Sequence, residues 1–109
     1  MNWYVICTKP NTELKVASQL NSLGINAFCP SYSFIKKYSD RKKKTEKPLM
    51  PRYVLVKMLE KDRTNVFAIP NVIRYLFWLG KPAIVRHEEI EILKNELEGY
   101  QSISKKSSL

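Results

Sequence analysis

The sequence contains few of the residues from which catalytic and metal sites are built. It has three glycines, two cysteines and one histidine among 109 residues. No Gly-rich phosphate-binding loop can form, and neither HExxH nor CxxC occurs. The histidine, His87, has no serine or cysteine placed to pair with it, so we expect an exposed residue at a helix start. These absences predict a protein that is not an enzyme, with no cofactor, no metal and no small-molecule substrate.

Long apolar runs are also missing. No segment is long enough to span a membrane, and Met1–Tyr4 lacks the charged and apolar regions of a signal peptide. We therefore expect a cytoplasmic protein with no membrane partner. Cys7 and Cys29 agree with this expectation, because each lies in an apolar run where a free cysteine packs as a small hydrophobic residue. Their spacing suits neither a disulfide framework nor a metal site.

Charge is the main compositional bias. Lysine and arginine number 19 against 10 acidic residues, which gives a net charge of +9. Residues 36–52 hold eight of these cations and two acidic residues. A surplus of this size favours a polyanionic partner or an acidic protein face. The alternative for this segment is a loop that water alone solvates.

The first third of the chain predicts a strand followed by a helix. Residues 3–8 are rich in β-forming side chains. Asn11 is a suitable N-cap, Glu13 suits the first helical turn, and Gly24 is the expected residue after the helix. The helix carries an apolar stripe that we expect to face the core: Val16, Ala17, Leu20 and Leu23.

The remaining elements alternate strands and helices. In chain order we expect an extended segment 25–38, a turn 39–42, a returning strand 43–48, a central strand 53–58, a short helix 60–67, a strongly apolar strand 72–79, an edge segment 83–85 and a helix 88–97. The last helix should face inward with Ile90, Leu93 and Leu97. This order predicts an α+β fold of ferredoxin-like or RNP-like type, an antiparallel sheet with helices packed on one face.

The order of four short segments resembles a known family. They are Trp3-Tyr4-Val5-Ile6, Gly24-Ile25-Asn26-Ala27-Phe28-Cys29-Pro30, Pro48-Leu49-Met50-Pro51-Arg52-Tyr53 and Gly80-Lys81-Pro82-Ala83-Ile84-Val85. Together they resemble the NusG N-terminal (NGN) domain superfamily over roughly residues 2–98. The resemblance implies a domain at 1–99 and a linker or tail at 100–109. Family members usually carry a KOW-type β-barrel after this linker, and we expect none within this sequence.

Within the superfamily, the basic segment 38–44 is most similar to the specialised transcription antiterminators of UpxY and RfaH type. The resemblance implies a transcription elongation factor that binds RNA polymerase at the clamp helices of the β′ subunit. Such a factor bridges the cleft toward the β lobe and suppresses pausing and termination. It also contacts non-template or upstream DNA in the elongation complex.

The resemblance implies a role for individual residues. An apolar pocket for the clamp helices would be built by Met50, Pro51, Tyr53 and Leu55, with Leu79, Ile90 and Leu93 beneath or beside it. Ordinary core packing is the alternative for several of these. Arg63 and Thr64 would contact the β lobe of the polymerase. The residues that would contact DNA are Lys9, Lys15, Gln19 and Ser22, together with Arg41, Lys42, Lys43 and Lys44 at the hairpin tip.

Two other functions fit the same architecture. An RRM-type RNA-binding module would use residues 52–58 as its RNP1 strand, but this strand lacks the glycine and two aromatic residues that stack bases. A metabolite-binding regulatory domain would need a small-ligand pocket and no basic hairpin. The basic hairpin and the order of segments favour the polymerase-binding domain.

Overall fold

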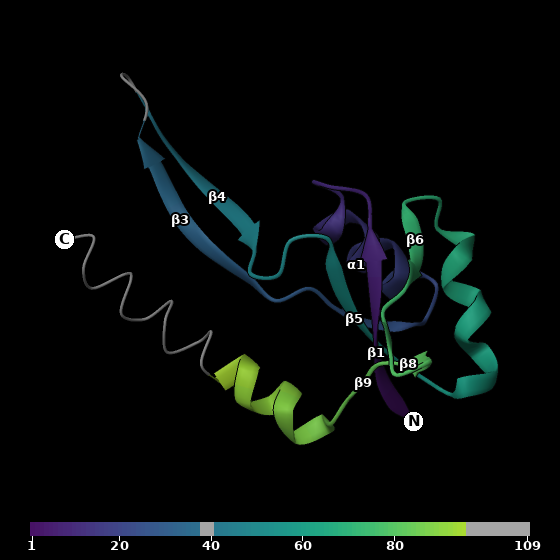
Figure 1. The fold of residues 1–109 in the computed structure, drawn as a ribbon. Helices are drawn as coiled ribbons and strands as arrows, with labels where there is room; N and C mark the ends of the chain where they lie inside the picture. The colour runs from purple at the N-terminus through teal and green to yellow at the C-terminus, as the bar shows by residue number, and fades with distance from the viewer. Residues whose placement is uncertain (38–40, 96–109) are drawn as a thin grey trace.

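The main sheet is antiparallel and is organised around the N-terminal strand. The computed structural model describes residues 1–37 and 41–95 (Figure 1). The strands of this sheet are β1 (Asn2–Thr8), β2 (Asn26–Phe28), β5 (Tyr53–Met58), β6 (Val72–Tyr75) and β9 (Ile84–Val85). Their order is β2-β5-β1-β6, and β9 pairs with the same edge of β1 as β6. β1 is therefore enclosed between β5 on one side and two short strands on the other.

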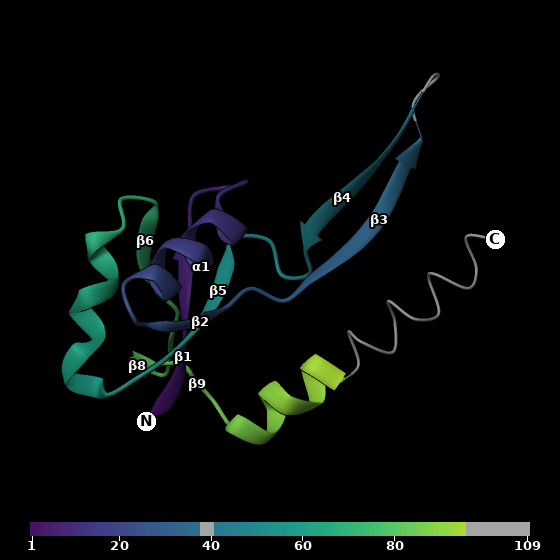
Figure 2. The ribbon, with the colours of Figure 1, turned by 180° about the vertical axis from the view of Figure 1, so that it is seen from behind.

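One face of the sheet packs against helices and forms the larger core. α1 (Glu13–Ser22) and the 3₁₀ helix η1 (Glu60–Ala68) both lie on this face, and α1 stands in front of β1 and β5 in Figure 2. The core contains alternate residues of the strands with the apolar stripe of α1: Tyr4, Ile6, Val54, Val56, Met58, Val16, Ala17, Leu20 and Val66. Strand alternation sends these side chains to a single face, which confirms the predicted α+β sandwich.

The predicted ends of α1 are partly wrong. Asn11 does not cap the helix; it adopts a left-handed φ of 64°, and Thr12 is the N-cap residue. The Thr12 hydroxyl donates a hydrogen bond to the Lys9 carbonyl at 2.6 Å, which closes a turn before the helix. At the other end Gly24 has a φ of 84°, as predicted for the residue after a helix. Leu23 is the C-cap and is exposed, so the buried stripe ends at Leu20.

The predicted extended segment 25–38 is two strands instead of one. β2 ends at Phe28, and β3 (Ser31–Lys37) begins after Cys29 and Pro30. Proline has no N–H to donate, so the ladder with β5 cannot continue through it. β3 pairs with β4 (Lys42–Pro48) in a separate two-stranded sheet that projects from the body (Figure 1). The predicted turn begins in residues outside the described ranges, and Lys42 already belongs to β4.

The predicted strand 72–79 is also divided. β6 ends at Tyr75, and a small hairpin follows, formed by β7 (Phe77–Trp78) and β8 (Lys81–Pro82). The two residues between these strands, Leu79 and Gly80, have φ values of 53° and 78°. Two consecutive left-handed residues are typical of a tight hairpin turn that matches strand twist. The apolar run therefore folds back on itself.

The last described helix lies on the other face of the sheet from α1. Residues 87–95 are helical, and Ile90 is fully buried against Trp3, Val5 and Leu55. The expectation that all helices share one face is wrong, because alternation along β1 and β5 produces a second apolar face that also requires cover. Leu97, the third predicted inward residue, lies outside the described ranges.

Two weakly acidic side chains in the core, those of Cys29 and Tyr75, have raised pKa values. Cys7 and Cys29 are both free and buried, as expected. Burial, together with the nearby carboxylates of Glu13 and Glu46, raises the pKa of the Cys29 thiol to about 11. Burial also raises the pKa of Tyr75 to about 12, with Arg63 opposing the rise. In both cases the core favours the neutral acid.

Because the folded chain keeps the Cys29 thiol and the Tyr75 hydroxyl neutral, we expect the free energy of unfolding to fall at alkaline pH. The Cys29 thiol ionises from an ordinary pKa of 9.0 when unfolded but from about 11 when folded, so rising pH favours unfolding across this window. Urea unfolding at about pH 8 and about pH 10.5 measures the loss. The double variant Cys29→Ala and Tyr75→Phe should show a smaller loss than the original chain. An equal loss would assign the effect to other groups.

Candidate functional site

The second face of the sheet carries an apolar cluster that its helix covers only in part. Four residues are buried: Trp3, Val5, Leu55 and Ile90. Six half-buried residues surround them: Phe28, Met50, Tyr53, Leu76, Val85 and Leu93. We call these ten residues the second-face cluster. Its half-buried members present apolar atoms at the surface, which is typical of a protein-binding site.

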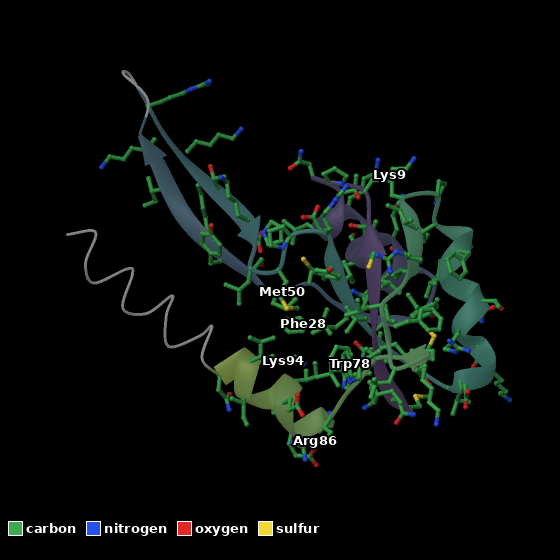
Figure 3. The ribbon with its side chains drawn as sticks, viewed as in Figure 1. Lys9, Phe28, Met50, Trp78, Arg86 and Lys94 are labelled. Carbon is green, nitrogen blue, oxygen red and sulfur yellow. The ribbon has the colours of Figure 1, made fainter. Side chains whose placement is uncertain are left out.

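The helix at residues 87–95 encloses one end of this cluster. The Lys94 ammonium lies 5.1 Å from the centre of the Phe28 ring and 5.9 Å from that of Trp3. The Trp3 indole N–H also points to Nδ1 of the exposed His87, at 3.5 Å. Met50, Phe28 and Lys94 lie together between β5 and this helix in Figure 3. Trp3 is therefore enclosed, whereas Met50 and Tyr53 are half-buried, and we call their side of the cluster its open side.

A tight turn, Met50–Tyr53, lies at the open side of the cluster. The Tyr53 amide donates to the Met50 carbonyl at 3.1 Å, and Arg52 has a φ of 73°. Proline at the second position and a left-handed residue at the third are the features of a type II turn. Pro51 and Arg52 are exposed, and Met50 and Tyr53 are half-buried beside them. The fixed φ of proline and the hydrogen bond across the turn restrict its conformation.

The residues predicted to bind the clamp helices fall into three groups. Met50, Tyr53 and Leu93 are accessible members of the second-face cluster, and Pro51 is exposed next to them. Leu55 and Ile90 are also members, but with 2% and 0% of their surface exposed they can act only as support beneath it. Leu79 is separate: it is 86% exposed at the β7–β8 turn and is not part of the cluster.

Sequence reasoning missed several residues of this face. Trp3, Phe28, Leu76 and Val85 belong to the cluster but were not predicted as site residues. Trp3 and Val5 could have been found, because strand alternation places them opposite Tyr4 and Ile6. The β7–β8 hairpin was also missed, with Phe77 at 53% and Trp78 at 72% exposure. Its signal was the Leu-Gly pair at the end of an apolar run.

The predicted DNA-binding residues of α1 share one side of the helix. Lys15, Gln19 and Ser22 follow each other at intervals of four and three, and Lys9 lies in the loop before the helix. Lys9 and Lys15 are exposed, which suits phosphate contacts. Ser22 donates its hydroxyl to the Ser18 carbonyl at 3.0 Å. Gln19 is half-buried, and its Oε1 has no hydrogen-bond partner within the described chain.

The β3–β4 hairpin carries the basic segment away from the body. Lys42, Lys43 and Lys44 are exposed along β4, and Arg41 precedes them. The register places Lys37 opposite Lys42 and Lys36 opposite Lys43. The hairpin is a second candidate surface, distinct from the second-face cluster.

Arg63 is held by aromatic rings within the fold. Its guanidinium lies 5.5 Å from the centre of the Tyr75 ring and 5.9 Å from that of Tyr4. The Tyr75 hydroxyl donates to the Arg63 carbonyl at 2.7 Å. Thr64, its neighbour in η1, is exposed. Of the two residues predicted to meet the opposite polymerase lobe, Thr64 is the freer to do so.

The described residues define the class of protein before any comparison. Residues 1–37 and 41–95 contain no group of three or more side chains with metal-ligating chemistry. No helix among them has the length and apolar character needed to cross a membrane. What they contain is a partly covered apolar face and two separate basic surfaces. These features are typical of a domain that binds macromolecules.

Comparison with known proteins identifies the family. The family model "Transcription termination factor nusG" matches residues 1–94. Among solved structures the chain is similar to "Domain interaction in Thermotoga maritima NusG", with 26% identity and a TM-score of 0.46. That similarity covers 82% of this chain and 52% of the other, so this chain spans about half its length. No protein in the curated set matches. The chain belongs to the NusG family of transcription factors.

The aromatic contacts of Arg63 predict a structural role. We expect Arg63→Ala to lower the free energy of unfolding by about 1–2 kcal/mol, because it removes a cation–π contact with two rings and the packing of the arginine stem. Thr64→Ala, at the exposed neighbouring position, should change it by less than about 0.5 kcal/mol. Urea unfolding of both variants measures the difference. Equal effects would show that Arg63 adds nothing to the fold.

Proposed function

We propose that this domain is an RNA polymerase-binding elongation factor domain that acts as an operon-specific antiterminator. Its docking surface would be the open side of the second-face cluster, placed on the β′ clamp helices. The observation that carries the proposal is the Met50–Tyr53 turn beside half-buried apolar side chains, in a chain of the NusG family. Bound there, the domain would bridge the cleft and suppress pausing and termination.

The accessible residues suit a helical partner. Met50 offers a flexible apolar side chain, and Tyr53 offers a broad ring with a hydroxyl at its end. Aromatic residues of this kind carry a large share of the binding energy at protein interfaces. Leu55 and Ile90 would support the surface from below, and Leu93 would border it. Thr64, with Arg63 behind it, would face the β lobe.

The basic residues would contact nucleic acid in the elongation complex. Lys9 and Lys15 would hold phosphates of non-template DNA, and Gln19 and Ser22 on the same side of α1 would reach base edges. The hairpin residues Arg41, Lys42, Lys43 and Lys44 would contact upstream DNA through charge. α1 and the second-face cluster lie on opposite faces of the sheet, so one domain could bind polymerase and DNA together.

The basic hairpin also supports the antiterminator subgroup. The similarity to UpxY and RfaH-type factors depends on the basic segment 38–44, of which residues 41–44 are described. These four residues are exposed on a projecting hairpin, as a nucleic-acid contact requires. Specialised factors of this kind act on particular operons because they read a DNA element as well as the polymerase.

The RRM-type alternative receives less support from the geometry. An RRM stacks bases on exposed aromatic residues of its sheet face. Here residues 87–95 cover part of the corresponding face, and Trp3 is buried beneath them. An RRM should also bind free single-stranded RNA, whereas we expect this domain to require polymerase or a transcription bubble.

Tyr53 provides the direct test of polymerase binding. We expect Tyr53→Ala to weaken binding to a β′ clamp-helix fragment by about tenfold or more, because it removes the largest accessible ring of the surface. The circular dichroism spectrum should stay unchanged. Ile73→Ala is the matched control, since Ile73 is exposed on β6 and outside the cluster. Unchanged affinity of a folded Tyr53→Ala variant would contradict the proposal.

The hairpin provides the test of DNA contact. Replacing Arg41, Lys42, Lys43 and Lys44 by serine should weaken association with a polymerase–DNA bubble complex mainly at about 50 mM salt. The difference should fade at about 300 mM salt, where the original charges are screened. Binding to the isolated clamp-helix fragment serves as the control and should not change. A loss of the same size at both salt concentrations would argue against an electrostatic role.

A further inference from the structure

Glu13 is a buried carboxylate that the proposed binding surfaces do not use. It is the first residue of α1, and only 4% of its surface is exposed. Buried acidic residues are rare unless they are paired or hydrogen-bonded. Its Oε2 accepts a hydrogen bond from the Arg52 backbone amide at 3.2 Å. Its Oε1 has no hydrogen-bond partner within residues 1–37 and 41–95.

Through this hydrogen bond, Glu13 contacts Arg52, the one residue of the Met50–Tyr53 turn with a strained backbone. Arg52 has a φ of 73°, a conformation that glycine adopts readily and that other residues adopt at a cost. Two further hydrogen bonds fix the same turn: the Thr8 amide donates to the Arg52 carbonyl at 2.8 Å, and the Tyr53 amide donates to the Met50 carbonyl at 3.1 Å. Glu13 in α1 therefore adds a third hydrogen bond, which holds the backbone amide of Arg52 in place.

The hydrogen bond between the Arg52 amide and the Glu13 side chain links distant parts of the fold. The contact joins α1 on one face of the sheet to a turn that leads to the other face. A change on the α1 side can in this way affect the geometry of the second-face cluster.

We infer that Glu13 is a positioning residue that holds Arg52 in its left-handed conformation and so sets how Met50, Pro51 and Tyr53 are presented to a protein partner. The role of the turn in docking rests on the function proposed above. The hold on Arg52 itself does not depend on that function. A glycine at position 52 would need no such hold, because it adopts the same φ without strain.

A double-mutant cycle with Arg52→Gly tests the inference. Glu13→Ala should weaken binding of the full chain to the β′ clamp-helix fragment by about tenfold in the original background. The same substitution in the Arg52→Gly background should weaken it by less than about threefold, because the turn no longer needs the carboxylate. An equal loss in both backgrounds would overturn the inference. So would a folded Glu13→Ala variant that binds like the original chain.

Amide exchange measured by NMR separates this inference from the proposed function. The Arg52 amide should lose protection in Glu13→Ala, and it should stay protected in Glu13→Gln, whose side-chain carbonyl still accepts a hydrogen bond. Glu13→Gln also provides a folded variant if Glu13→Ala does not fold. If the original chain fails to bind the clamp fragment but shows these exchange changes, the proposed function fails and the hold on Arg52 stands. Unchanged protection in Glu13→Ala overturns the inference whatever the binding result.

Discussion

The pairing of β1 with β5 is the constraint on which the rest of the structure depends. Their ladder runs from Asn2 opposite Met58 to Cys7 opposite Tyr53. Both strands are apolar on both faces, so each face requires cover. α1 and η1 cover one face, while residues 87–95 cover the other in part. The candidate docking surface is what remains of the second face.

Separation of charge from the core gives the domain its two kinds of surface. Three exposed lysines, Lys42, Lys43 and Lys44, are carried on the β3–β4 hairpin, and Lys9 and Lys15 are exposed before and on α1. The hairpin is a two-stranded sheet separate from the main sheet. One chain of this size can therefore present an apolar surface and basic surfaces that are separate from it.

Much of the fold could be predicted because its signals are local. The α1 stripe, the β5 strand and the turn residues Gly24 and Pro51 follow from short-range sequence preferences. One error is local: the sequence favours Asn11 as the cap, but the Thr12 hydroxyl closes the turn by donating a hydrogen bond to the Lys9 carbonyl. Another error occurs where tertiary contacts decide. The run from residue 72 to 79 was predicted as one strand, but β1 has room along that edge for both β6 and β9.

The sequence by itself determined the class of protein, the absence of recognisable catalytic motifs and the candidate binding residues Met50, Tyr53 and Lys42. Only the tertiary structure decided which candidates are accessible, because exposure depends on segments distant in sequence. In the helix at residues 87–95, Ile90 packs against Leu55 and Trp3 and is buried. Leu79 lies in the turn between β7 and β8 and is not part of the cluster. The contact between Glu13 and Arg52 joins residues 39 positions apart. No local pattern contains such a contact, since it exists only when the sheet brings α1 and the turn together.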